Sequence, residues 1–138
     1  MQLTDSKAIS QFILKAAKRE DIILKSQGKQ TFSYLYIFDV VSAILLVASS
    51  GKSCNAYNIA DNNQTYSLLE LANILADISH TKVRFDIPDE LEKKGASNFT
   101  DVRLDATKLH DLGWSSKVDL PEGLRQTVSR FAKQNGFS

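Results

Sequence analysis

The sequence contains little of what metal and cofactor sites require. Its 138 residues include one cysteine, Cys54, and two histidines, so neither an internal disulfide nor a closed zinc site can form within the chain. The six glycines are dispersed, and none belongs to the G-x-G-x-x-G or P-loop pattern that turns around a nucleotide diphosphate. The composition therefore predicts a chain that holds neither a metal nor a dinucleotide by itself.

Charge of one sign and long apolar runs are also scarce. Seventeen Lys and Arg against 16 Asp and Glu give a net charge of +1, which argues against general nucleic-acid binding and against a polybasic membrane anchor. The longest apolar stretch, residues 43–48, is far shorter than the roughly 20 residues of a membrane span, and the first six residues lack the order of a signal peptide. We expect a cytoplasmic protein with no membrane partner.

Local patterns predict one mixed α/β domain in which short strands are packed by about five helices. Apolar residues recur at helical spacing in several segments, and β-branched or aromatic residues dominate others. The expected helices cover residues 5–18, 40–49, 67–79, about 109–112 and a segment that begins at 121; the expected strands cover 21–25, 32–37, 56–60 and 82–87.

Several helix ends have capping signals. Ser67 and Glu70 form a capping box, and Pro121 with Asp119 just upstream opens the last helix. Asp39 is expected to cap the helix over 40–49, and Gly51 to end it in a left-handed conformation. That helix is apolar nearly all round, which is typical of a buried element. Gly113 closes the short helix, and Trp114 is placed to fold back onto it.

Catalytic patterns are missing. No tyrosine is followed by a lysine four residues later, no G-x-S-x-G elbow is present, and the two histidines are thirty residues apart. Residues 68–85 superficially match a helix-turn-helix, but Ala76 replaces the turn glycine and Lys82 would be an inward-facing charge. We therefore predict no catalytic residue in this chain and no DNA-reading helix.

An ordered set of segments resembles a known family. The residues are Leu24-Lys25-Ser26-Gln27-Gly28, the run from Gln30 through Tyr34 and Asp39 to Ile44, Ala56-Tyr57-Asn58-Ile59-Ala60, Ser67 to Ala72, and Leu104 to Trp114. In order and spacing they are similar to the C-terminal part of NAD-dependent epimerase/dehydratases, the extended short-chain dehydrogenases that act on sugar nucleotides. The likeness covers nearly the whole chain.

The resemblance implies a specific architecture and role. Residues 1–138 would form a single C-terminal substrate-binding domain, the small lobe that closes over a nucleotide sugar. The N-terminal Rossmann domain, which holds NAD(P) and the catalytic Tyr-x-x-x-Lys in that family, would be absent, through either excision or a truncated gene product. NAD(P) would then be a cofactor of the missing half only, and this fragment would be inactive alone although its parent is an isomerase or lyase.

The resemblance also suggests substrate contacts. Many members have an arginine two residues before the position of Tyr34, where it meets the substrate diphosphate, but this chain has Phe32 there. Phe32, Tyr34 and Asn58 are the expected substrate-binding residues, together with Lys94 as the nearest match to a second phosphate-binding base. The alternatives are that Phe32 and Tyr34 pack in the core and that Lys94 belongs to a solvated charge run.

A different class of function stays open. Without its partner lobe, the chain would expose apolar surface, which favours self-association. The apolar helix over 40–48 supports this alternative, a non-enzymatic interaction or oligomerisation module.

Overall fold

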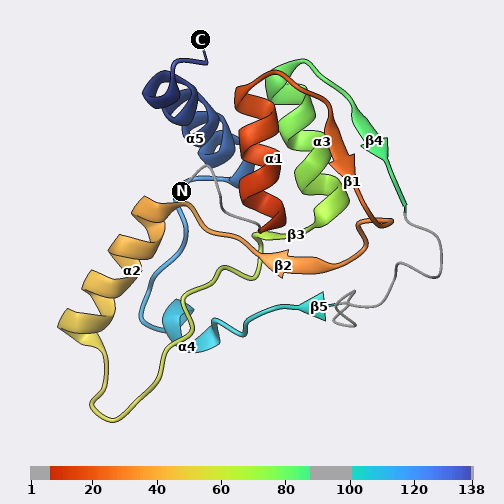
Figure 1. Cartoon of the computed structure of the whole chain (residues 1–138). Coiled ribbons are helices and arrows are strands. Elements are labelled where there is room, and N and C mark those ends of the chain that lie inside the picture. The colour runs from red at the N-terminus through yellow and green to blue at the C-terminus, as the bar shows by residue number, and fades with distance from the viewer. Residues whose placement is uncertain (1–6, 88–100, 138) are drawn as a thin grey trace.

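The computed structural model describes residues 7–87 and 101–137. Figure 1 shows one group of helices side by side at one end of the fold and another group at the other end, connected by short strands. The helices are α1 (Ala8–Ala17), α2 (Ile37–Ser50), α3 (Leu68–Ser79), α4 (Thr107–His110) and α5 (Leu120–Asn135), and the strands are β1 (Ile22–Leu24), β2 (Thr31–Ser33), β3 (Thr65–Ser67), β4 (Val83–Phe85) and β5 (Asp101–Val102).

The strands form two small sheets. In the first, β1 pairs in parallel with β4, so that Ile23 lies opposite Arg84. In the second, β2 is central, with β3 antiparallel on one side and β5 parallel on the other. The predicted mixed α/β class is therefore confirmed, although each strand is only two or three residues long.

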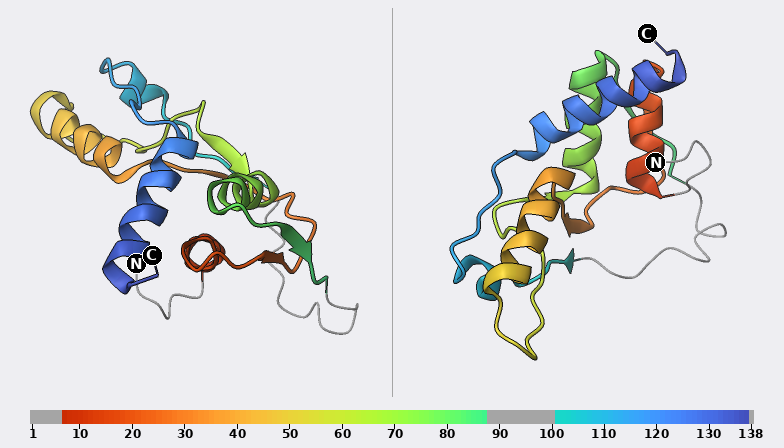
Figure 2. Two further views of the ribbon diagram at one scale, coloured as in Figure 1. Left: turned by 90° about the horizontal axis from the view of Figure 1, so that it is seen from above. Right: turned by 90° about the vertical axis from the view of Figure 1, so that its left-hand side faces the viewer.

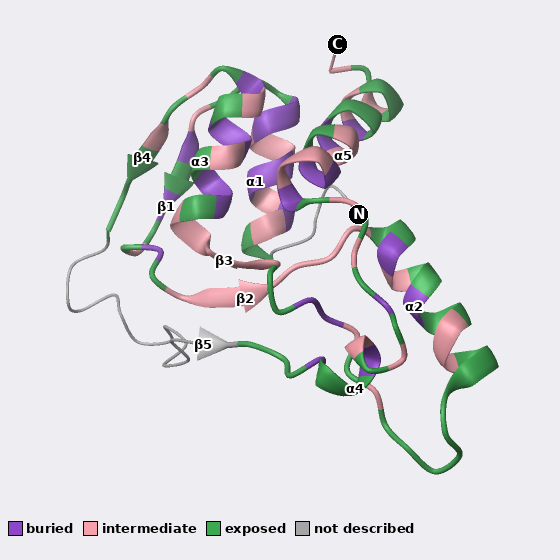
Figure 3. Ribbon diagram, turned by 180° about the vertical axis from the view of Figure 1, so that it is seen from behind, coloured by how far each residue is buried: buried purple, intermediate pink, exposed green. Residues whose placement is uncertain are grey.

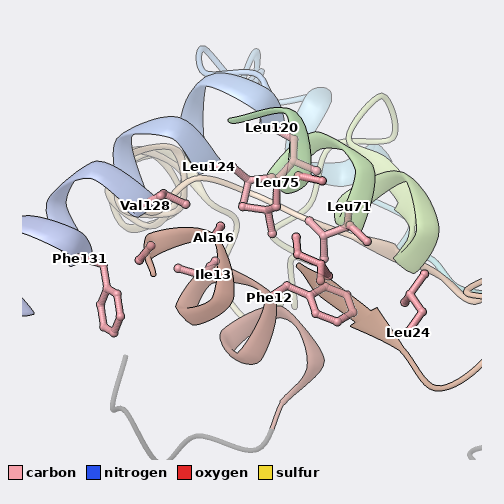
Figure 4. Packing of buried hydrophobic residues seen from close by; sticks show 14 residues of the cluster. Phe12, Ile13, Ala16, Leu24, Leu71, Leu75, Leu120, Leu124, Val128 and Phe131 are labelled. Atoms are coloured by element: carbon pink, nitrogen blue, oxygen red, sulfur yellow. The ribbon is translucent and has the colours of Figure 1, made fainter. Parts of the chain in front are cut away.

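The main core lies between α1, α3 and α5 and continues onto β1 (Figure 4). The side chains of Ile22, Leu71 and Leu75 are fully buried there. Burial of one such side chain contributes about 1.5–3 kcal/mol, so this cluster is the main source of stability. The apolar faces predicted for the first, third and last helices are the ones that meet in this core.

The predicted caps of α3 and α5 are confirmed. Ser67 Oγ accepts a hydrogen bond from the Glu70 amide at 3.1 Å, while Glu70 Oε2 accepts one from the Ser67 amide at 2.7 Å. At the start of α5, Asp119 Oδ1 accepts from the amide of Glu122 at 2.9 Å, and Pro121 lies in the first turn. Each side-chain oxygen satisfies an amide that the first helical turn leaves unpaired.

The expectations for α2 need correction. The helix begins at Ile37, three residues earlier than predicted, so Tyr36 occupies the N-cap position and Asp39 lies inside the first turn. Gly51 has a φ of −69°, which is not left-handed. Only Asp39 and Ala43 of this helix are buried, so the prediction of a buried helix is wrong for this chain (Figure 3).

Two strand predictions also need correction. Residues 56–60 form no strand, because none of the described backbone pairs with them, and β3 forms at 65–67 instead. The predicted strand over 32–37 is shortened to β2 because α2 begins at Ile37.

A second, smaller core joins α2 to α4. Ala43, Leu109 and Trp114 are buried together, and Trp114 Nε1 donates to Ser42 Oγ at 2.9 Å. Gly113 has a φ of +86° and ends the turn after α4, so the predicted return of Trp114 onto this helix is confirmed. Figure 2 shows α2 and α4 set to one side of the layer formed by α1, α3 and α5.

Within the described ranges, no helix is long and apolar enough to cross a bilayer.

Candidate functional site

Phe32 and Tyr34 follow one another along β2 and its extension. Phe32 lies opposite Tyr66 of β3, and the rings of Phe32 and Tyr34 are 6.3 Å apart. Both side chains are partly buried, and Tyr34 packs against the main core. The core-packing alternative therefore describes Tyr34 better than Phe32.

Burial has a chemical consequence for Tyr34. Its desolvated environment raises the pKa of the phenol to about 12. The side chain is therefore neutral at physiological pH and offers an O–H donor or acceptor rather than a general base. Its backbone amide donates to the carbonyl of Gln64 at 2.9 Å, which fixes the chain just before α2.

Asn58 is exposed and lies outside the helices and strands. Its Nδ2 donates to the backbone carbonyl of Asp105 at 2.8 Å, so the side chain connects the 56–60 segment to the chain before α4. The Asp105 carboxylate accepts from the hydroxyl and the amide of Thr107, and these bonds lower its pKa. A cavity of about 340 Å³ lies beside this connection, lined by Asn62, Thr65, Arg103, Leu104 and Asp105.

Lys94 lies outside the described residues. The other three predicted site residues are not among the residues that line the cavities at α1, β1 and β5. The roles of Phe32, Tyr34, Asn58 and Lys94 in substrate binding therefore stay predictions.

A cavity that the sequence did not reveal lies between the start of α1 and the end of β1. Its volume is about 580 Å³, within the roughly 300–1,000 Å³ of small-molecule sites. Apolar side chains form one part of its lining, and amides, ammonium groups and one carboxylate form another. The lining includes Phe12, Leu24 and Leu68 on the apolar side and Gln11, Gln30, Lys15, Lys25 and Asp86 on the polar side.

Gly28 shapes the turn beside this cavity. It has a φ of +67°, and a Cβ at this position would lie 2.9 Å from the amide nitrogen of Leu69. The Gly28 carbonyl accepts from that same amide at 3.0 Å, which joins the turn to the first residues of α3. A glycine between two predicted strands is the one sequence signal that pointed to this location.

The described residues offer binding groups rather than a catalytic constellation. Lys15 is paired with Glu20 at 2.5 Å, whereas Lys25 is exposed and extends from the end of β1. In the described ranges, no three His, Cys, Asp or Glu side chains lie close enough to hold a metal. The cavity between α1 and β1 therefore combines apolar side chains with amide groups, the exposed ammonium group of Lys25 and the carboxylate of Asp86.

Comparison with known proteins extends the resemblance. Residues 1–60 match the model of the NAD dependent epimerase/dehydratase family. Over 88% of its length, the chain is 32% identical to dTDP-D-glucose 4,6-dehydratase of Bos taurus, and over 97% it is 28% identical to UDP-glucuronic acid decarboxylase 1 of Xenopus tropicalis. The chain belongs to the NAD-dependent epimerase/dehydratase family.

Solved structures of related proteins show the same fold. The UDP-glucose 4-epimerase of Thermotoga maritima, solved with UDP-glucose, matches 96% of this chain with a TM-score of 0.76 and 26% identity. RMD of Pseudomonas aeruginosa, solved with NADPH, matches 96% with a TM-score of 0.77 and 24% identity. This family member spans 31% and 35% of the two curated relatives and 41% of the epimerase chain.

Proposed function

We propose that this chain is the C-terminal nucleotide-sugar-binding domain of an NAD-dependent sugar-nucleotide epimerase or dehydratase and does not catalyse a reaction by itself. NAD(P) and the catalytic groups would belong to a Rossmann domain outside residues 1–138. The observation that carries the proposal is the match of nearly the whole chain to part of an epimerase solved with UDP-glucose. The missing glycine-rich turn and Tyr-x-x-x-Lys pair support it.

The cavity between α1 and β1 supplies suitable chemistry for the nucleotide. A base needs a flat apolar wall, which Phe12 and Leu24 offer, and a diphosphate needs cations, of which Lys25 is exposed at the rim. Gln30 lines the cavity and directly precedes β2, which carries Phe32. We therefore propose that the base enters the cavity and that the rest of the ligand extends along β2 toward Phe32 and Tyr34.

Titration with UDP-glucose and dTDP-glucose, followed by amide chemical shifts, tests this proposal. We expect saturable shifts at Phe12, Leu24 and Gln30. Lys25→Gln should weaken binding about fivefold, which corresponds to about 1 kcal/mol, whereas the remote exposed substitution Lys108→Gln should leave it unchanged. Equal affinities for the two variants would contradict the site. Turnover of UDP-glucose by the chain with added NAD would contradict the proposed lack of catalysis.

A second candidate function rests on α2. On its outer face, five large apolar side chains are each between 46% and 64% exposed. They are Ile37, Phe38, Val41, Ile44 and Leu45. Such a continuous apolar face is typical of a surface that another protein covers. If the chain is a nucleotide-sugar-binding domain, the Rossmann domain would cover this face of α2. If the chain is an oligomerisation module, a second copy of the chain would cover it.

Sedimentation velocity at increasing concentration distinguishes the two. A second copy as the cover predicts dimers that Leu45→Glu dissociates. A missing domain as the cover predicts monomers at low concentration and recovery of a stable complex when a Rossmann domain of the family is added in trans. A strict monomer that binds no such domain would contradict both assignments of the face.

A further inference from the structure

A second cavity lies at the other end of α1 from the proposed nucleotide site. It has a volume of about 310 Å³ and is enclosed by the ends of α1 and α3 and by one side of α5. Ala16, Ala17 and Val128 form its floor, and Ile78 and Phe137 form apolar walls. Figure 4 shows Val128 and Ala16 facing one another at this junction of helices. Small side chains on the floor leave the space that a larger residue would fill.

The rim of this cavity is positively charged. Arg19, His80 and Lys133 line it from three different segments of the chain. None of these three side chains has a hydrogen-bond or ion-pair partner among residues 7–87 and 101–137. Arg125 also lines the cavity but is paired with Glu122. In the described part of the chain, two cations without carboxylate partners, Arg19 and Lys133, and the imidazole of His80 thus surround a small apolar space.

The backbone holds two of these three residues in uncommon conformations. Arg19 has a φ of +57° and His80 a φ of +56°, in the left-handed region that glycine most often occupies at the end of a helix. His80 is the C-cap of α3, and Arg19 follows the C-cap of α1. A side chain with a Cβ is strained in this conformation, whereas glycine is not. The ends of α1 and α3 therefore place Arg19 and His80 at the cavity, at positions where glycine would be less strained.

One further cation extends the positive rim. Lys18 Nζ lies 5.5 Å from the centre of the Phe137 ring, which is a wall of the cavity. The attraction between an ammonium group and an aromatic face keeps this charge beside the opening. The rim therefore suits a ligand with two negative charges, and the apolar floor suits a compact apolar body.

We propose that this cavity binds a small organic phosphate monoester. The dianionic phosphate would contact the guanidinium of Arg19 and the ammonium group of Lys133, which are groups that recognise phosphate, and would accept a hydrogen bond from an imidazole N–H of His80. The ester's apolar body would rest on Ala16, Ala17 and Val128. This site is separate from the proposed nucleotide cavity, which lies at the opposite end of α1, and it does not depend on the assigned function.

Titration of the full chain with phenyl phosphate, followed by amide chemical shifts, tests the site. Inorganic phosphate, phenol and benzoate are the matched probes, because they lack the ring, the charge and the second charge, respectively. We expect phenyl phosphate to produce saturable shifts at Ala16, Val128 and Phe137 and to bind at least about tenfold more tightly than each of the other three.

Substitutions separate a built site from simple charge attraction. Arg19→Gln and Lys133→Gln should each weaken phenyl phosphate binding about fivefold, whereas the distant Lys108→Gln should not. Ala132→Leu fills the cavity without changing its charge and should abolish binding, with unchanged thermal unfolding as the control for folding. Binding that survives Ala132→Leu, or that inorganic phosphate matches, would overturn the proposal, as would the absence of saturable shifts.

Discussion

One buried carboxylate contributes, beside the small core with Trp114, to the attachment of α2 to the rest of the protein. Asp39 is only 3% exposed, and its Oδ1 and Oδ2 accept hydrogen bonds from the amides of Lys117 at 2.9 Å and Val118 at 3.1 Å. The substitution Asp39→Asn keeps the size of the side chain but replaces one acceptor oxygen with an NH2 group. That group would face an amide N–H, so one of the two amides would lose its partner.

The expected cost follows from these contacts. A hydrogen bond to a charged group contributes about 1.5–3 kcal/mol, and a buried amide without a partner costs about 1–3 kcal/mol. The carboxylate also lies in the first turn of α2, where a negative charge contributes about 0.3–1 kcal/mol. Because these terms overlap, we expect Asp39→Asn to lower the free energy of unfolding by about 2–4 kcal/mol.

Urea unfolding measures the total, and amide hydrogen exchange shows where the loss occurs. Because α2 buries little else, its amides should lose protection before those of α1, α3 and α5. Asp111→Asn, an exposed aspartate after α4, is the matched control and should change stability by less than about 0.5 kcal/mol. If Asp39→Asn behaves like Asp111→Asn, or if α2 keeps its protection, the reasoning is refuted.

Three further predictions concern the core, a cap and acid stability. Leu75→Ala should cost about 2–5 kcal/mol in thermal or urea unfolding, because the side chain is fully buried. Ser67→Ala should cost about 1 kcal/mol by breaking the capping box of α3, and a value near zero by the same assay would contradict this. Burial raises the pKa of Asp61, but hydrogen bonds from Ser116 and Asn63 outweigh it, so the net shift is downward. The stabilisation is therefore present above about pH 4 and lost as the pH falls through the lower folded-state pKa, and urea midpoints measured against pH should lose this acid-side slope in Asp61→Asn.

The helices of the main core were predictable because their signals are local. The apolar stripe and capping box of α3, with Ser67 and Glu70, lie within a few residues of one another, so neighbouring side chains alone favour that start. The same holds for α5, where Asp119 and Pro121 specify the first turn. The start of α2 was not predictable in this way, because the Asp39 carboxylate accepts hydrogen bonds from the amides of Lys117 and Val118 and does not cap the helix.

The strands and the cavities depended on distant partners. Residues 56–60 have a strand-like composition, but a strand also needs a neighbouring backbone, and none of the described residues supplies one. The ring centres of Phe32 and Tyr34 lie 6.3 Å apart, since alternate residues of an extended chain share a face. The cavity between α1 and β1 was missed because its lining comes from segments separated by up to about 80 residues.

The amino-acid sequence by itself determined the helices of the core, the caps of α3 and α5, the mixed α/β class and the family. Each of these depends on residues close together in the chain or on an ordered series of motifs. Only the tertiary structure decided that α2 is exposed, that Asp39 holds two amides of a distant loop and that two separate cavities flank α1. These features arise from which surfaces meet after folding, and that depends on the packing of distant segments rather than on any local pattern.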